Sequence, residues 1–242
     1  LKTFGLRDGL SVVELGSGPG IVTDLLLRLL PGLTITSIEH REETVVQARA
    51  YLRDRGHSGV RVVQADVLET SLPDNAFDFA YARLVFRYLP EPLEAIREAV
   101  RLLKPGGILV ISDIDLDLWG LFEPPIPELR PALDAYGRML AARRGDARIG
   151  RRLVRLLEAA GLTRTGIEAV ATTSADLAEG RSMGTFLAPI GLGRLERMVQ
   201  GGWLTAQERD HARNGWKRFL ASPSPFVLKV MLVAGGARAE AD

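Results

Sequence analysis

The chain has 242 residues, a length that suits one α/β domain of ordinary size with a sizeable core. Its 31 basic and 30 acidic side chains leave a formal net charge of +1, which argues against nucleic-acid binding as its main property. The absence of cysteine excludes disulfides and thiolate metal sites. No apolar run approaches the ~20 residues of a membrane span, and the first residues carry no signal-peptide pattern. We therefore expect a soluble, cytoplasmic protein, and the start at Leu1 suggests a piece of a longer one.

Apolar periodicity and turn residues predict alternating strands and helices over the first half of the chain. The strands are expected at Ser11–Glu14, Leu33–Glu39, Val60–Ala65, Phe77–Ala82 and Ile108–Ser112. The helices are expected at residues 21–30, Glu42–Arg55 and Pro92–Leu103, with a Lys-Pro-Gly-Gly turn at residues 104–107. This alternation predicts βαβ units, and therefore a parallel sheet with right-handed crossovers.

Beyond residue 116 the regular alternation stops. Two further helices are predicted at Ala132–Arg143 and Arg148–Ala160, followed by a strand at Ile167–Thr172. The apolar segment Phe226–Ala234 predicts a buried last strand. Between these two strands lies an insertion, Ser174–Ser222, with helical patterns at Arg194–Gln200 and Ala206–Leu220. The second of these helices is preceded by a capping box that starts at Thr205.

The first predicted strand ends in a glycine-rich turn at the start of a helix. Gly16, Gly18 and Gly20 allow positive φ angles and leave the amides around Ser17 open to a ligand. Amides at a helix N-terminus attract a carboxylate or a phosphate. Such turns also serve dinucleotides, but Glu14 just before the glycines would repel a pyrophosphate and attract the ammonium of an amino-acid moiety.

Charged residues follow the other predicted strands at the same edge of the sheet. In parallel sheets, ligands bind beyond the carboxyl ends of the strands, where the winding order reverses. Glu39, Asp66, Arg83 and Asp113 all fall at carboxyl ends. We therefore expect these side chains to share one crevice with Glu14 and the glycine turn.

Several segments in this order resemble one family. They are Val12–Gly20, Ile38-Glu39, Gln64–Val67, Phe77–Phe79, Arg83–Pro92 and Leu103–Gly107. Together they resemble the class I S-adenosylmethionine-dependent methyltransferases, in particular their bacterial small-molecule branch, and the likeness covers about residues 10 to 115. It implies a Rossmann-like, mostly parallel sheet with an antiparallel last strand, helices on both faces and a helical lid insertion. The expected core is residues 10–115, 148–173 and 223–235, and the expected lid is residues 116–147 and 174–222.

The resemblance implies roles for the residues at the strand ends. The Gly16–Gly20 turn would face the methionine portion of S-adenosylmethionine, with Glu14 favouring its ammonium. Glu39 would accept hydrogen bonds from both ribose hydroxyls, although an acid at a helix N-terminus is also favoured by the helix dipole. Asp66 would accept from the adenine amino group, while the Val67 amide serves a ring nitrogen.

Two further roles complete the expected cofactor site. The backbone near Arg83 would lie beside the methionine portion, and His40 would stack beside the adenine. For Asp66 the alternative is a local Asx turn.

Candidate catalytic residues are harder to assign. His211 could act as a general base if the helix at residues 206–220 closes over the pocket, although the favoured interpretation is an ordinary surface or core histidine. Asp113 and Asp115 could flank the substrate, but we expect them on a solvated loop or at a helix cap. No metal site is predicted. Transfer of a sulfonium methyl mainly requires alignment and a desolvated site, so no strong base is needed.

Two larger sets of residues allow a functional or a structural interpretation. The arginines could hold RNA phosphates, or they could form the wet side of amphipathic helices, as the balanced charge favours. They are Arg143, Arg144, Arg148, Arg151, Arg152 and Arg155. The large apolar side chains of the last segments could line a substrate pocket, although several must be core. They are Trp119, Phe122, Met183, Phe186, Met198, Trp203, Trp216 and Phe219.

The expected function is transfer of the methyl group of S-adenosylmethionine to a small, largely apolar metabolite held under the lid segments. Transfer to oxygen is favoured, with nitrogen or carbon possible. Alternatives are an RNA or protein methyltransferase, a nicotinamide-dependent oxidoreductase, or a cofactor-binding or structural domain of a larger assembly. The segment Tyr81–Leu84 lacks the Asn/Asp-Pro-Pro-Tyr/Phe type of motif, which argues against the first alternative. The Lys-Pro-Gly-Gly turn and Asp66 argue against the second.

Overall fold

The computed structural model describes residues 1–118, 120–174 and 192–240. Its strands are β1 (Ser11–Leu15), β2 (Thr34–Glu39), β3 (Arg61–Gln64), β4 (Phe77–Arg83), β5 (Leu103–Asp113), β6 (Leu121–Glu123), β7 (Thr163–Thr173) and β8 (Phe226–Ala237). Its α-helices are α1 (Ile21–Leu29), α2 (Glu42–Asp54), α3 (Pro92–Leu102), α4 (Arg130–Ala142), α5 (Leu153–Ala159), α7 (Leu192–Gln200) and α8 (Ala206–Leu220). The strands and helices predicted over the first half of the chain are all present, with ends that differ by a few residues.

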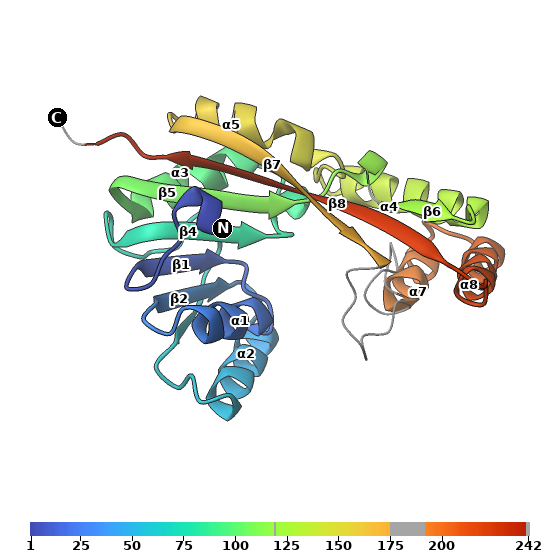
Figure 1. Ribbon diagram of the computed structural model, residues 1–242, viewed down its shortest axis with the longest axis horizontal. Coiled ribbons are helices and arrows are strands. Elements are labelled where there is room, and N and C mark those ends of the chain that lie inside the picture. The colour runs from blue at the N-terminus through green and yellow to red at the C-terminus, as the bar shows by residue number, and fades with distance from the viewer. Residues whose placement is uncertain (119, 175–191, 241–242) are drawn as a thin grey trace.

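The strands form one sheet in the order β3-β2-β1-β4-β5-β8-β6, with β7 also paired to β8 (Figure 1). Strands β1 to β5 pair in parallel, whereas β8 runs antiparallel to β5, β6 and β7. This is the predicted Rossmann-like sheet with an antiparallel last strand. The winding order reverses between β1 and β4, so the crevice of such a sheet opens at the carboxyl ends of these two strands.

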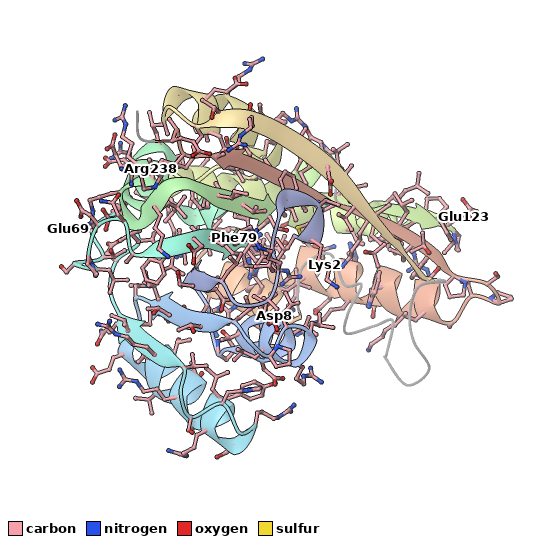
Figure 2. All side chains as sticks on the ribbon, turned by 60° about the vertical axis from the view of Figure 1, so that its left-hand side comes forward. Lys2, Asp8, Glu69, Phe79, Glu123 and Arg238 are labelled. Carbon is pink, nitrogen blue, oxygen red and sulfur yellow. The ribbon has the colours of Figure 1, made fainter. Side chains whose placement is uncertain are left out.

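Alternate residues of the central strands pack into two different cores, as the two-residue period of a strand requires. Val13 and Ala80 lie in a cluster that includes residues of α3 and α5. Val12 and Phe79 lie in a second cluster with Leu26 of α1. Figure 2 shows Phe79 in the middle of the sheet. Helices therefore cover both faces, as predicted.

Strands β7 and β8 extend beyond the parallel strands and carry a second group of elements (Figure 1). Here α4, α7 and α8 surround a separate apolar cluster. We call these three helices, together with the cluster between them, the helical layer. Phe122, Trp216 and Phe219 contact one another in it, with Trp216 stacked on Phe219 at a centroid distance of 5.2 Å. The predicted capping box at the start of α8 is present, because Thr205 and Glu208 exchange hydrogen bonds.

Two details differ from the expectations. The Lys-Pro-Gly-Gly segment is a bulge inside β5 rather than a turn before it: Leu103 pairs with Phe77 and Ile108 with Phe79. Gly106 accommodates this bulge with a φ of +74°. The short strand β6 is additional. No helix in the described ranges is long and apolar enough to cross a bilayer.

Candidate functional site

A cavity of about 900 Å³ lies between the carboxyl ends of the parallel strands and the helical layer. In Figure 1 the arrowheads of β1, β4 and β5 point toward α4 and α7. We call one wall the strand side, which contains Gly16, Glu39, His40, Asp66 and Val67. We call the other wall the helix side, which contains Tyr88, Met139, Arg143, Arg194, Arg197 and Trp203. The predicted crevice is therefore present, and the helical layer closes its far wall.

The glycine turn forms one corner of the strand side. Gly16, Gly18 and Gly20 have φ angles of +68°, +56° and +85°. A Cβ on Gly16 would lie 2.5 Å from a methyl of Val85, whereas a Cβ on Gly18 would meet nothing within 4 Å. Gly18 therefore keeps open space on the loop, into which a ligand can reach its backbone.

Ser17 is the clearest sign that this loop is built for a ligand. Its amide donates to the carbonyl of Ile38 at 2.9 Å, which fixes the loop against β2. Its hydroxyl is buried without a hydrogen-bond partner among the described residues. A buried hydroxyl without a hydrogen-bond partner costs free energy. A ligand that forms a hydrogen bond with it would remove this cost and would therefore be stabilised here.

Glu14 lies beneath the turn, buried and outside the residues that line the cavity. Its carboxylate accepts hydrogen bonds from the hydroxyls of Thr23 in α1 and Ser37 in β2. Burial raises the pKa of Glu14 to about 7, although the bonds from Thr23 and Ser37 oppose that rise. A nearby positive charge would favour the ionised form of Glu14 and lower this pKa, and its predicted action on a ligand ammonium remains a proposal.

Glu39 connects the glycine turn to the start of α2. One of its carboxylate oxygens accepts from the amide of Gly18 at 3.1 Å, and the other accepts from the amides of His40 and Arg41 at 3.0 and 3.2 Å. The helix-terminal role considered from the sequence is therefore present in the structure. The carboxylate also lines the cavity, so it can accept bonds from a ligand as well.

Asp66, Val67 and His40 line the cavity beside Glu39. One Asp66 oxygen accepts from the amide of Leu68 at 2.9 Å, which is the Asx turn considered as an alternative. The other oxygen has no protein partner among the described residues. The His40 ring is 70% exposed, and its Nδ1 lies 3.6 Å from Glu39 Oε1. Both side chains are thus available to a ligand in the cavity.

Strained backbone marks the end of β4. Arg83 is exposed and lines the cavity. The next residue, Leu84, has a φ of +61°, and its amide donates to the carbonyl of Ser112 at 2.8 Å. A leucine in the left-handed region costs of order 1–3 kcal/mol and tends to occur at functional sites.

The structure corrects the predicted positions of Asp113 and Asp115. Both side chains are fully buried rather than solvated, and neither lines the cavity. Asp113 accepts from Arg87 Nη1 at 2.9 Å and from the amide of Arg87 at 3.2 Å. Asp115 is paired with Arg151. Because their oxygens are occupied by these buried ion pairs, a direct role on the substrate is not supported.

His211 also lies elsewhere than the general-base hypothesis requires. It is exposed on α8. It does not line the cavity, because α7 and not α8 forms that part of the wall. The structural interpretation of His211 as a surface histidine is the one that the geometry supports.

The arginine and apolar sets divide between the site and the scaffold. Arg148, Arg151 and Arg152 form ion pairs with the acids at residues 115, 117 and 146. These arginines lie on the solvent-exposed faces of their segments. Arg143 lines the cavity, and so does Trp203. Phe122, Met198, Trp216 and Phe219 belong to the core of the helical layer. Trp119, Met183 and Phe186 lie outside the described residues.

The sequence interpretation missed the helix side of the cavity. Arg87, Tyr88, Tyr136 and Arg194 form one hydrogen-bonded group there, described in detail below. Arg87 and Tyr88 directly follow the end of β4, which was the available signal. Their partners are 49 and 106 residues away, and no local pattern indicates them.

The strand side fits a nucleoside that carries an amino-acid end. It offers two acids at neighbouring strand ends, and beside them the open space at Gly18 and the buried Ser17 hydroxyl without a described partner. Such a set matches the several donors of a ribose and an adenine together with a charged amino acid.

Comparisons with known proteins agree with this fit. Residues 13–111 match the family described as "Methyltransferase domain". An uncharacterised 37.1 kDa protein of transposon Tn4556 from Streptomyces fradiae is 30% identical over 96% of this chain and 63% of its own length. The ubiquinone/menaquinone biosynthesis C-methyltransferase UbiE of Pseudomonas paraeruginosa is 32% identical over 56% of this chain and 51% of its own length. The chain thus spans only part of these relatives.

Among solved structures, a SAM-dependent methyltransferase from Aquifex aeolicus is 27% identical. It superimposes with a TM-score of 0.53 over 70% of this chain and 79% of its own. The sheet order, the strand-end acids and these likenesses lead to the same family. The chain therefore carries a methyltransferase domain at residues 13–111, of the type that uses S-adenosylmethionine as its cofactor.

Proposed function

We propose that this protein transfers the methyl group of S-adenosylmethionine to a small acceptor, with an oxygen of the acceptor as the favoured position. One observation carries the proposal: a single cavity has the features of a nucleoside site on its strand side and a separate wall on its helix side. A methyl donor and an acceptor need such adjacent places, because the transfer is an in-line displacement that depends on alignment.

On the strand side, each role rests on a group that the structure leaves available. The Glu39 carboxylate, which lines the cavity, and the unpaired oxygen of Asp66 would receive the ribose and adenine donors, with the Val67 amide beside them. The Ser17 hydroxyl and the Gly18 backbone would contact the methionine portion, with Glu14 favouring its ammonium from below. When bound, the cofactor supplies an electrophilic methyl group.

On the helix side, apolar groups would hold the body of the acceptor and exclude water. Leu84, Val85 and Leu89 follow the end of β4, and Met139 and Trp203 come from the helical layer. This arrangement supports the lid role proposed for residues 116–147 and 174–222, because both segments contribute residues to the wall. A dry wall next to the transferred methyl strengthens every electrostatic contact made there.

Binding of S-adenosylhomocysteine, measured by calorimetry, tests the cofactor half of the proposal. Wild type should bind it, and Glu39→Ala should bind about tenfold or more weakly, since a lost hydrogen bond to a charged group costs about 1.5–3 kcal/mol. Glu42→Ala is the matched control, because Glu42 is an exposed acid in the first turn of the same helix and lies outside the cavity. Equal affinity for all three proteins would remove Glu39 from the site.

Turnover tests the second half. Labelled S-adenosylmethionine is offered with panels of phenols, carboxylic acids, amines, RNA and protein, and label is sought in each product. Label in a small-molecule product supports the proposal. Label only in RNA or protein contradicts it, and binding without any turnover favours a structural domain.

A further inference from the structure

Four side chains on the helix side form a compact group around two phenol oxygens. The hydroxyl oxygens of Tyr88 and Tyr136 lie 3.1 Å apart. Arg194 Nη1 lies 2.7 Å from the Tyr88 oxygen and 2.8 Å from the Tyr136 oxygen. Arg87 reaches the same two oxygens through Nη2, at 3.0 Å from Tyr88, and Nε, at 3.1 Å from Tyr136. Two guanidinium groups therefore donate to both phenols.

The two guanidinium groups differ in how their charge is balanced. Arg87 is buried and paired with Asp113 at 2.9 Å. Arg194 is half-buried, lines the cavity, and has no carboxylate partner among the described residues. One positive charge of the group therefore remains unbalanced, and it is the one that faces the cavity.

Other charges on this wall increase the imbalance. Arg143 and Arg197 line the helix side, and within the described ranges neither forms an ion pair. The acids of the described cavity lining are Glu39 and Asp66, both on the strand side. The helix side thus presents positive charge without an acid of its own among the described lining residues, next to a low-dielectric apolar wall that screens it poorly.

The hydroxyl protons lead to the same conclusion. Each phenol oxygen already accepts from both arginines, and one O–H can be donated across the 3.1 Å between them. Tyr136 is buried, whereas Tyr88 is 39% exposed and lines the cavity. With Tyr136 donating to Tyr88, the Tyr88 O–H has no acceptor among the described residues and is free to donate into the cavity.

We propose that the helix side of this cavity binds an anionic oxygen group of the acceptor, a carboxylate or a phosphate, through Arg194, Arg197, Arg143 and the Tyr88 hydroxyl. The proposal rests on the proposed function and names the acceptor class: a small molecule with an apolar body and a negatively charged oxygen group. It differs from the largely apolar acceptor expected from the sequence. Arg87 and Asp113 act as positioning residues, because they hold Tyr88 and Tyr136 without facing the cavity themselves.

Ligand titrations with a neutral isostere as reference test this proposal. The protein is saturated with S-adenosylhomocysteine and titrated with benzoate, phenyl phosphate or benzamide, with binding followed by ligand-observed NMR. Benzoate or phenyl phosphate should bind wild type at least about tenfold more tightly than benzamide, since charged hydrogen bonds distinguish them. The tighter of the two anions identifies the carboxylate or the phosphate as the group. Equal binding of all three ligands would overturn the proposal.

Matched variants locate the effect. Arg194→Gln and Arg197→Gln should each reduce anion binding about tenfold and leave benzamide unchanged. Arg155→Gln is the control, because Arg155 is exposed on α5 and lies outside the cavity. Arg194→Gln could also loosen α7, but the Arg197 side chain donates no hydrogen bond to a described residue, so its variant tests charge alone. Anion binding that is unchanged in Arg197→Gln and Arg194→Gln would show that the arginines only tether α7, against the proposal.

Two further readouts separate the remaining outcomes. The first is tyrosinate absorbance at neutral pH. If wild type shows this absorbance, Tyr88→Phe loses it and no anion is preferred, then the Tyr88 phenolate itself balances the charge of Arg194. That outcome would overturn the proposal. Calorimetry of S-adenosylhomocysteine is run on every variant. If wild type fails to bind it, the proposed function fails. If all proteins bind it equally while no anion is preferred, the acceptor inference alone fails.

Discussion

Replacing Glu14 by glutamine tests whether burial under the glycine turn perturbs this carboxyl as strongly as its surroundings indicate. Burial raises the pKa of Glu14 from 4.5 to about 7, against the hydrogen bonds from Thr23 and Ser37. Each unit of pKa difference between folded and unfolded states corresponds to 1.36 kcal/mol, so the difference is worth about 3 kcal/mol.

The sign follows from which state binds the proton more tightly. The folded protein does, so the contribution of Glu14 to stability is fully present below pH 4.5 and is lost as the pH rises through about 7. Glutamine is a neutral side chain of the same shape and has no such dependence. The free energy of unfolding of Glu14→Gln, relative to that of wild type, should therefore rise by about 3 kcal/mol as the pH rises from 4.5 to above about 7.

Urea unfolding of both proteins, without ligand and at pH values from about 4.5 to about 8, measures this difference. Glu42→Gln is the control, since this exposed acid should give a nearly constant offset. A difference between Glu14→Gln and wild type that does not change with pH would refute the reasoning. It would mean that Glu14 stays ionised in the folded protein throughout.

Three other predictions concern the stability of the fold. Gly16→Ala should destabilise by about 2–4 kcal/mol, from a positive φ and contact with Val85, whereas Gly18→Ala should cost only about 1 kcal/mol of strain; equal urea midpoints would contradict this. Trp216→Ala should cost about 3–5 kcal/mol, measured by thermal unfolding, because the ring is buried among aromatics; a loss below about 1 kcal/mol would place it outside the core. Thr205→Ala should cost about 1 kcal/mol through loss of the α8 cap, and restoration by Thr205→Ser would confirm the mechanism.

The parallel half of the fold could be predicted from the sequence because its signals are local. The buried strands are bounded by turn residues, and β1, β2 and β4 are each followed by a helix of the expected period. Glu39 and Asp66 could be placed in one crevice because parallel strands all end at the same edge. These predictions needed topology but no knowledge of side-chain contacts.

Asp113 shows where the same reasoning fails. A position at the end of a strand fixes the edge but not the direction in which the side chain points, since successive residues point to opposite faces. The Asp113 side chain points into the protein, where Arg87 neutralises it. Whether an acid at a strand end meets ligand or a buried arginine depends on a contact that no spacing in the sequence encodes.

The helix side of the cavity was beyond prediction for a related reason. Its members come from the segment after β4, from α4 and from α7. Because these segments lie far apart in the sequence, no local pattern indicates that they meet in the structure. The sequence shows a set of arginines. It does not show which of them form ion pairs on the surface and which one, Arg143, lines the cavity. Only the packing of α4 and α7 against the sheet makes that distinction.

The length of β8 has a consequence for building chimeras of this protein. This 12-residue strand has Val227 in the cluster of the helical layer and Ala234 in that of the sheet. A junction placed between the two clusters would cut the ladder with β7, which is continuous from Thr173–Leu228 to Gly166–Gly235. Acceptor specificity should therefore be transplanted as one graft from the end of β5 to the end of β8. Exchanging α4, α7 and α8 alone would leave the donor helices on a foreign strand.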